Sequence, residues 1–572
     1  MGIGTKPRID LDRYRNGGIK ARKHFAVKAE CFFRGSWTRW KVTAVRNAFI
    51  DCCFLMTLFF LFYQWFVIMK THILIKRGLM HMNRKTGVLL PLSSLPGTHG
   101  IGDCGEHAYQ WIDLLHENGV KIWQILPLNP LGYGNSPYQS CSSFAGDEIY
   151  ISLPMLVKEG LLPQKYSRKK GKQNDRVDYP AVKKTKREAL QKACRIFYHK
   201  KLDQRQDYQD FLKLAFWLPH YALFMAIRAQ YGDVSWVDWQ REDRDALLDQ
   251  NYDQSMLETE KRYHYFVQYL FFRQWRQLKR YAEEKGVSIM GDIPIYLGLD
   301  SADVWEHRSY FLLDKKGRPR FVAGVPPDYF SAQGQRWGNP IYNWKALKKH
   351  HYDFWINRLY WNQMLYHIIR IDHFRAFDDY WKIPASCQTA IEGKWELGPR
   401  HDFFRNVFQQ LPDIQIVVED LGILRKQALK LRDDFHLMGM KIIQFDLDDT
   451  ADSFLKEDKK HLLIYTGTHD NEPIRSWYEA LAPSLQKHTR NMLNRLQIKE
   501  RRISRGLIRF TLASHADAAI IPAWDLLHLG KNARFNVPAT IGSPNWEWRL
   551  TTLSKIENEL KWLHEWILFY KR

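Results

Sequence analysis

The sequence has few cysteines and no cluster of metal-binding side chains. Its 572 residues include seven Cys, which are scattered and odd in number, so they predict neither a disulfide framework nor a zinc motif. No glycine-rich phosphate loop, zinc-finger spacing or aromatic ribonucleoprotein signature is present. We therefore expect no metal, no organic cofactor and no nucleic-acid partner. Reduced thiols and a cytoplasmic location are the simplest interpretation.

The net charge of +23 is unevenly distributed along the chain. Residues 1–79 hold fifteen Lys and Arg against four Asp and Glu, a net charge of +11, and all the remaining residues together carry only +12. A strongly basic protein can bind nucleic acid or an anionic membrane. Because the long C-terminal part is only mildly basic, charge gives little support for either partner there.

Long apolar runs are rare, and Ala48–Met69 is the strongest one. About 20 apolar residues can span a bilayer, but this run lies too deep in the chain for an ordinary signal peptide. If it is a signal anchor, its basic flank places the N-terminus inside and the remainder outside. The alternative, which we favour, is that residues 1–79 either precede the natural start at Met80 or Met82 or form a dispensable leader. A membrane partner is expected only in the first case.

Eight short apolar runs follow residue 80, and most are nearly continuous hydrophobic segments, as expected for parallel strands buried on both faces. Between the first two, Glu106–Glu117 has apolar residues at helical spacing. Strand–helix–strand repeats of this kind predict an α/β fold, a (β/α)8 TIM barrel. The predicted strands are Val88–Leu92, Ile122–Leu126, Val287–Ile293, Ile368–Asp372, Ile414–Glu419, Lys441–Phe445, Leu462–Thr466 and Ala518–Ile521.

The gap between the second and third predicted strands is too long for one crossover. Helical patterns at Tyr208–Tyr231 and Glu258–Lys285 predict a large helical insertion on the catalytic face, and the charged stretch Lys165–Lys186 is expected to be a solvated loop or helix face. We also expect further loop subdomains on that face. The predicted division is an N-terminal extension (1–79), the first part of the barrel (80–152), the helical insertion (153–275) and the rest of the barrel (276–572).

Four acidic residues stand at or directly after these apolar runs: Asp292, Asp372, Glu419 and Asp470. The C-terminal ends of parallel barrel strands meet on one face, where catalytic residues gather. A single acidic residue in such a place is more often a helix cap or a partner in a surface ion pair, but four of them together favour a shared pocket. Carboxylates without Cys or His ligand clusters indicate sugar chemistry, in which two carboxylates do most of the work.

The two reacting carboxylates need different protonation states. Arg370 stands two residues before Asp372, on the same face of an extended strand, and is expected to hold Asp372 ionised as the nucleophile. Glu419 follows Ile-Val-Val and precedes Asp420. A dry site and a neighbouring negative charge would raise the pKa of Glu419, as an acid/base residue requires.

The other two carboxylates are expected to bind rather than to react. Asp470, preceded by His469, is suited to accept hydrogen bonds from sugar hydroxyls as the ring distorts. Asp292 could bind Arg370 or the substrate. His373 and His469 on their own are more often structural hydrogen-bonding residues than bases.

Three motifs surround these carboxylates: Arg370-Ile-Asp-His-Phe-Arg375, Val418-Glu-Asp-Leu-Gly422 and Gly467-Thr-His-Asp-Asn471. They resemble the motifs of the 4-alpha-glucanotransferases (amylomaltases, or disproportionating enzymes; glycoside hydrolase family 77), in the alpha-amylase superfamily. The resemblance runs from about residue 80 to 572 and departs from the family pattern at Ala376, Phe535 and Ala539. It continues in Leu89–Gly97, Ser136–Ser140, Gly291–Ile295, Asp300–Trp305, Val322–Phe330, Gly334–Pro340 and Arg534–Thr540.

This resemblance implies roles for individual residues. Asp372 would be the nucleophile, Glu419 the acid/base and Asp470 the stabiliser of the transition state. An extended loop at Gly324–Gln335 would cover the cleft, which suits transfer because a glycosyl-enzyme intermediate must meet a sugar before water. The residues expected to bind substrate are Tyr138, Asp292, Tyr329, Phe330, Trp337, Arg370, His373, His469 and Asn471.

The implied function is a 4-alpha-glucanotransferase. It would move α-1,4-glucan segments to the 4-hydroxyl of glucose or a maltooligosaccharide by a retaining double displacement, in maltodextrin, glycogen or starch metabolism. Its partners would be maltose, maltooligosaccharides, amylose and glycogen-derived dextrins. Two alternatives stay open: an α-glucan hydrolase on the same fold, and a membrane-anchored binding protein that has lost catalysis.

Overall fold

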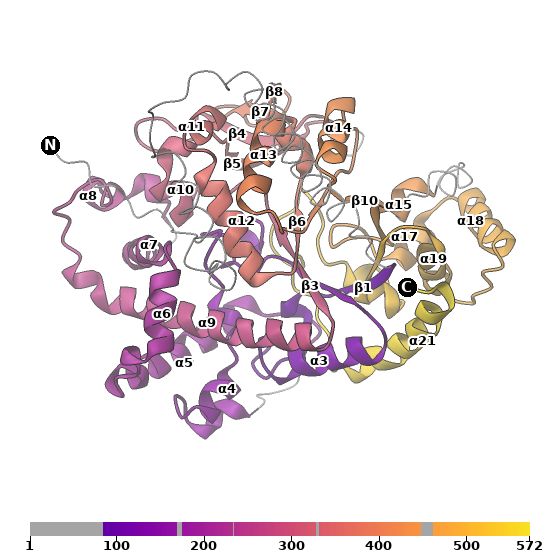
Figure 1. Cartoon of the computed structure of the whole chain (residues 1–572), viewed down its shortest axis with the longest axis horizontal. Coiled ribbons are helices and arrows are strands. Elements are labelled where there is room, and N and C mark those ends of the chain that lie inside the picture. The colour runs from indigo at the N-terminus through magenta and orange to yellow at the C-terminus, as the bar shows by residue number, and fades with distance from the viewer. Residues whose placement is uncertain (1–83, 169–173, 233, 328–330, 448–460) are drawn as a thin grey trace, which may run out of the picture. The chain divides into compact units, whose positions relative to one another are not determined.

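The computed structural model describes residues 84–168, 174–232, 234–327, 331–447 and 461–572 (Figure 1). The apolar run Ala48–Met69 lies outside these residues, so neither interpretation of it is tested. Within the described part of the chain, no helix is both long enough and apolar enough to cross a membrane. The four cysteines described there are free thiols.

Eight parallel strands form one sheet in the order β10-β11-β12-β1-β2-β3-β6-β9. The two outer strands also meet, through a parallel bridge between Val417 and Met438 and a hydrogen bond of 2.9 Å from the Val418 amide to the Met438 carbonyl. The sheet therefore closes, and the predicted TIM barrel is confirmed. Its strands are β1 (Lys85–Leu89), β2 (Ile122–Gln124), β3 (Ser288–Ile293), β6 (Ile368–Ile371), β9 (Ile416–Val418), β10 (Gly439–Ile442), β11 (Leu462–Tyr465) and β12 (Ala518–Pro522).

Burial on both faces explains why these strands could be recognised in the sequence. All five residues of β12 and all four of β6 are buried. The first crossover helix, α3 (Glu106–Glu117), has the predicted bounds and buries one apolar stripe against the barrel. The remaining helices of the barrel and its loops are α10 (Ala302–Glu306), α11 (Trp344–Lys349), α12 (Asp353–Leu365), α13 (Arg400–Gln410), α14 (Lys426–Asp434), α15 (Ile443–Asp446), α17 (Ile474–Ala480), α18 (Pro483–Arg495), α19 (Ile503–Ala513), α20 (Ala523–Leu526) and α21 (Ser554–Tyr570).

Two predicted strands are misplaced by two or three residues. The first was expected at Val88–Leu92, whereas β1 is Lys85–Leu89. The sixth was expected at Lys441–Phe445, whereas β10 begins at Gly439 and the chain turns into α15 at Ile443. At Gly439 a Cβ would lie 2.5 Å from a carboxylate oxygen of Asp420, so any other residue at this position would displace the Asp420 side chain. Hydrophobicity alone could not locate that contact.

The chain between β2 and β3 is largely helical. It contains α4 (Leu153–Lys158), α5 (Tyr179–His199), α6 (Gln206–Leu214), α7 (Leu218–Tyr231), α8 (Arg241–Arg244) and α9 (Glu258–Glu284). The helix predicted at Tyr208–Tyr231 is two helices, because Pro219 in the first turn of α7 cannot continue a preceding helix. The predicted boundary at residue 275 falls inside α9, and the division into domains stays a prediction.

The charged stretch Lys165–Lys186 is not solvated along its whole length. Lys186 lies in α5 and is fully buried, with its ammonium 2.8 Å from Asp103 and 2.6 Å from the Ile151 carbonyl. A buried charge is tolerated when it is paired and hydrogen-bonded. This pair attaches α5 to the segments that flank the first crossover of the barrel.

A second, antiparallel sheet was not predicted. Its four strands have the order β5-β4-β7-β8, and Figure 1 shows it close to α11 and α13. Its strands are β4 (Phe321–Val325), β5 (Gln335–Pro340), β7 (Asp379–Pro384) and β8 (Lys394–Leu397). The expected cleft-covering loop, Gly324–Gln335, thus begins and ends inside strands of this sheet. Tyr329 and Phe330 of that loop lie outside the described residues.

Candidate active site

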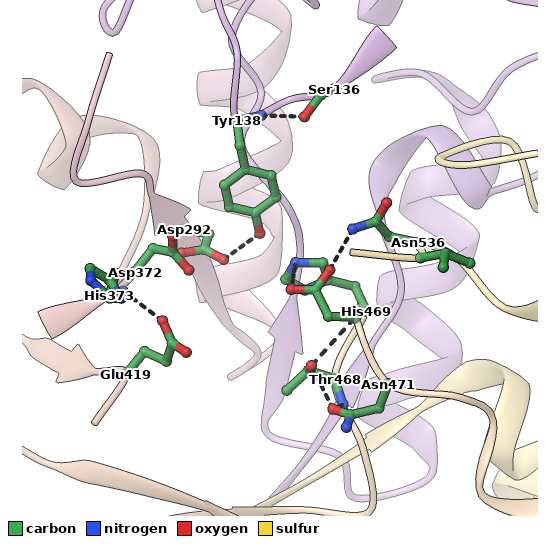
Figure 2. Close-up of polar contacts among 12 residues, drawn as sticks. Ser136, Tyr138, Asp292, Asp372, His373, Glu419, Thr468, His469, Asn471 and Asn536 are labelled. Atoms are coloured by element: carbon green, nitrogen blue, oxygen red, sulfur yellow. Dashed lines mark hydrogen bonds and ion pairs between the residues drawn. The ribbon is translucent and has the colours of Figure 1, made fainter. Parts of the chain in front are cut away.

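The barrel brings the predicted carboxylates to one face. Asp292 is the fifth residue of β3, Asp372 and Glu419 directly follow β6 and β9, and Asp470 lies in the loop after β11. Figure 2 shows Asp292, Asp372, His373 and Glu419 facing a second group formed by Thr468, His469, Asn471 and Asn536, with Tyr138 between them. Residues separated by up to 400 positions in the sequence therefore line one site.

Arg370 lies at the centre of the carboxylates. In the pairing of β3 with β6 it stands directly opposite Asp292. Its Nη1 is 2.6 Å from Asp292 Oδ2 and 3.1 Å from Asp372 Oδ1, and its Nη2 is 3.7 Å from Glu419 Oε2. The side chain is only 4% exposed. One guanidinium is thus shared by three carboxylates, including the Asp372 contact that strand alternation predicts.

The protonation of the reacting pair differs from what was expected. Burial and the negative charge of Glu419 raise the pKa of Asp372 well above its usual range, although Arg370 opposes this. Burial also acts on Glu419, but Arg370, His373 and a hydrogen bond with Asp372 outweigh it and lower the pKa of Glu419. The His373 amide donates to Glu419 Oε2 at 2.6 Å. Arg370 contacts both carboxyls, so the His373 amide and imidazole make the difference: they favour the charge on Glu419 and leave the proton on Asp372.

Asp420 does not have the effect that its sequence position suggested. Its Oδ2 is 2.6 Å from Arg432 Nη1, and its Oδ1 accepts a hydrogen bond of 2.7 Å from the Met440 amide. The carboxylate is therefore turned toward α14 and β10, away from Glu419. Its negative charge is neutralised there rather than raising the pKa of the acid/base residue.

Aromatic rings flank the carboxylates on two sides. The Tyr138 hydroxyl donates to Asp292 Oδ2 at 2.8 Å, and its ring stacks on His469 at a centroid distance of 5.3 Å. Trp337 meets the His373 ring edge-on at 5.0 Å. His373 has a φ of 49°, in the left-handed region, which lets the chain turn sharply directly after Asp372.

The Asp470 loop is held by a segment that was not predicted to belong to the site. Asn536 Nδ2 donates to Asp470 Oδ1 at 2.6 Å, and Arg534 Nη2 donates to the Asp470 carbonyl at 3.1 Å. The Asn536 amide also donates to the His469 carbonyl at 3.1 Å. The signal was available, because both side chains belong to the motif Arg534–Thr540. Nothing in their spacing, however, indicated which carboxylate they would reach.

Asn471 has a role within its own loop, and its contact with substrate stays a prediction. Its Oδ1 accepts hydrogen bonds from the amide of Thr468 at 2.9 Å and from its hydroxyl at 2.8 Å. The carboxamide oxygen therefore shapes its own loop. The Asp470 side chain, in contrast, is 45% exposed and accessible to a sugar. Across the described residues, no group of three or more His, Cys, Asp or Glu is arranged to hold a metal ion.

Comparison with known proteins gives a consistent result over most of the chain. Residues 90–554 match the model of the 4-alpha-glucanotransferase family. The chain is 41% identical over 484 residues to a 4-alpha-glucanotransferase of Thermus thermophilus, covering 82% of this chain and 95% of the relative. It is 38% identical over 508 residues to the chloroplastic/amyloplastic 4-alpha-glucanotransferase of Solanum tuberosum, covering 86% of each.

Solved structures agree with the sequence relatives. An amylomaltase from Streptococcus agalactiae in complex with acarbose superposes with a TM-score of 0.81 at 36% identity, covering 86% of this chain and 99% of that one. An amylomaltase from Corynebacterium glutamicum gives a TM-score of 0.68 at 17% identity, covering 86% of this chain and 76% of that one, and supports the fold alone.

Proposed function

The chain belongs to the 4-alpha-glucanotransferase family, and on that premise we propose that it moves segments of α-1,4-glucan from a donor chain to the 4-hydroxyl of glucose or a maltooligosaccharide. Donors of this kind are maltooligosaccharides, amylose and glycogen-derived dextrins. The observation that carries the proposal is the Asp372–Glu419 pair, which shares one guanidinium and lies across the site from Asn536, the side chain that holds Asp470. The relatives from Thermus thermophilus and Solanum tuberosum and the Streptococcus agalactiae amylomaltase support neither the hydrolase nor the inactive binding protein.

The proposed reaction is a double displacement. Asp372 attacks the anomeric carbon while Glu419 protonates the departing glycosidic oxygen, and Glu419 then takes the proton of the acceptor hydroxyl as that oxygen displaces Asp372. This chemistry needs the proton on Glu419 and the charge on Asp372. Because the charge of Glu419 raises the pKa of Asp372, the two carboxyls compete for one proton. The reactive form is reached when that proton moves from Asp372 to Glu419, and Arg370 contacts both residues.

The residues opposite the pair are proposed to bind the sugar. The exposed carboxylate of Asp470 would accept hydrogen bonds from ring hydroxyls, and these bonds would strengthen as the ring flattens toward the transition state. Tyr138 and Trp337 would form apolar walls against the faces of the sugars. By excluding water, these rings would slow hydrolysis of the glycosyl-enzyme intermediate and so favour its transfer to an acceptor sugar.

Maltotriose tests the function directly. We expect glucose and maltopentaose to appear together while the total number of reducing ends stays constant, because transfer breaks one glycosidic bond for each bond it makes. Proton NMR of the early products should show only α-linkages, since two inversions retain configuration. A rise in reducing ends that matches maltotriose loss would identify a hydrolase. Early β-anomers would exclude the double displacement.

The pH dependence follows from the shared proton. The lowered pKa of Glu419 and the raised pKa of Asp372 keep the pair singly protonated over a wide range. Below that range both carboxyls are protonated and the nucleophile is lost, and above it both are ionised and the acid is lost. We expect kcat/KM to form a broad bell whose acidic limb lies below about 4.3, the ordinary pKa of glutamic acid. Both limbs belong to the pair rather than to one residue.

The measurement is kcat/KM for maltotriose at each pH, with the melting temperature recorded in the same buffers. This control separates loss of catalysis from loss of the fold. An acidic limb above about pH 5, in protein that is still folded, would contradict the lowered pKa of Glu419.

A further inference from the structure

Both ends of the loop that carries His469, Asp470 and Asn471 are bound by one carboxylate. The loop follows β11, and α17 begins after it at Ile474. Asp525 Oδ2 accepts a hydrogen bond of 2.6 Å from the Thr466 hydroxyl, at the end where the loop starts. Asp525 Oδ1 accepts one of 2.8 Å from the Ile474 amide, where the loop ends.

The fold explains how Asp525 reaches both ends. It lies in α20, directly after β12, and β12 is the barrel neighbour of β11. The Asp525 side chain is 1% exposed, and Thr466 and Ile474 are fully buried. The Ile474 amide belongs to the first turn of α17, where amides have no partner within the helix. Asp525 supplies that partner from the neighbouring strand end.

A carboxylate is a costly group at this position. Burial raises the pKa of Asp525 to about 7, against the effect of both hydrogen bonds. Burying an ionisable group costs free energy, so proteins usually place apolar residues at such positions. Exceptions to this rule are found more often at functional sites. What the carboxylate provides is two acceptor oxygens at a fixed separation, one for each end of the loop.

We propose that Asp525 is a positioning residue for Asp470. The inference rests on the proposed function, in which Asp470 stabilises the transition state. Asn536 holds the Asp470 carboxylate directly, whereas Asp525 fixes the base of the loop from beneath. Without Asp525 the loop ends can move relative to the barrel, and a displacement of about 1 Å at a reacting centre can lower a rate about a hundredfold.

Asp303 provides a matched control. Its two oxygens also accept one backbone amide and one hydroxyl, both from Ser143, at 2.9 and 2.8 Å. It is 4% exposed, and burial raises its pKa as well. Asp303 lies in α10 and makes neither bond to the Asp470 loop. Loss of a buried carboxylate can therefore be compared at two places, only one of which supports the loop.

The experiment measures maltotriose transfer per folded molecule for Asp525→Ala, Asp525→Asn and Asp303→Ala. We expect Asp525→Ala to lower kcat about ten- to a hundredfold with KM changed less than about threefold, because the loss falls on the transition state. The Asn variant should stay within about fivefold of the wild type, since its carbonyl can accept the Ile474 amide and its amino group can face Thr466. Asp303→Ala should stay within about twofold.

A double-mutant cycle with Asp470→Asn shows whether Asp525 acts on the rate through Asp470 or through a general disturbance of the fold. Adding Asp525→Ala to Asp470→Asn should lower the residual rate less than about threefold, because the residue that Asp525 positions is already disabled. A drop as large as that in the wild-type background would overturn the proposal. So would Asp525→Ala with wild-type kcat. If Asp525→Ala does not fold, Thr466→Val removes one of the two bonds and is judged by the same cycle.

The same set of variants separates failure of the inference from failure of the function. Wild-type transfer by Asp470→Asn would refute the role proposed for Asp470, and with it the need to position that residue. Loss of transfer in Asp470→Asn together with full turnover in Asp525→Ala would refute the inference alone.

Discussion

Asp372→Asn and Glu419→Gln are each expected to lower transfer from maltotriose at least about a thousandfold while the protein stays folded. Asp372→Asn replaces the carboxylate proposed to attack the anomeric carbon by a neutral carboxamide, which is a much weaker nucleophile. Glu419→Gln removes the proton that the leaving oxygen needs and the base that the acceptor needs. Both substitutions keep the size of the side chain and remove one ionisable group, so circular dichroism and melting temperature should remain close to the wild type.

An activated donor assigns the two roles separately. A maltosyl fluoride needs little acid assistance to form the intermediate, but the intermediate still needs a base to leave. Glu419→Gln should therefore accumulate a covalent maltosyl adduct on the peptide that contains Asp372, visible by mass spectrometry, and Asp372→Asn should form none. Asp420→Asn is the control, because its carboxylate is adjacent to Glu419 in sequence but pairs with Arg432. Asp420→Asn should keep most of the wild-type transfer rate. If Asp372→Asn or Glu419→Gln kept more than about a tenth of the wild-type rate, the catalytic roles proposed for these two residues would be overturned.

The barrel was predictable because its strands are buried on both faces and leave short, nearly continuous apolar runs in the sequence. The carboxylates were predictable for the same reason, since Asp372 and Glu419 stand where β6 and β9 end. The second sheet left no such pattern. β5, for example, is Gln335–Pro340, which contains Gly338 and a terminal proline and is only partly buried. Tertiary contacts with β4 determine that strand, and single-sequence patterns do not record them.

The location of the shared proton was not predictable either. Sequence shows that Arg370 and Asp372 are two residues apart, but the pKa of Asp372 also depends on how close Glu419 and Asp292 come and on how dry the site is. The residues that hold the Asp470 loop were missed for a related reason. Asn536 is 66 positions from Asp470 and Asp525 is 59 from Thr466, so only the closed barrel shows that they meet.

Arg370→Met is expected to abolish transfer and also to destabilise the fold. Arg370 is the cation shared by Asp292, Asp372 and Glu419, and Met fills a similar volume without the charge. Removing one partner from a buried ion pair costs about 3–5 kcal/mol, because the remaining charge is left uncompensated. Arg370→Lys keeps the charge but cannot contact several carboxylates in one plane, so it should lose less stability while still losing most of the activity.

The pH dependence of the loss of stability in Arg370→Met identifies the cause of that loss. In Arg370→Met the folded carboxyls lack their cation, so their pKa values rise above those of the unfolded chain. The folded state then binds protons more tightly, and it gains stability relative to the unfolded state as the pH falls. The free energy of unfolding from urea denaturation should therefore differ most from the wild type near neutral pH and approach it near pH 5. Arg358→Met is the comparison, because Arg358 is also buried but donates to the carbonyls of Pro294 and Ile295 rather than to carboxylates. Its deficit should change less over that pH range, because Arg358 lowers the pKa of one buried carboxyl, Asp303, rather than contacting three. An equally small change in Arg370→Met would mean that lost packing, not the three carboxylates, explains why the guanidinium is there.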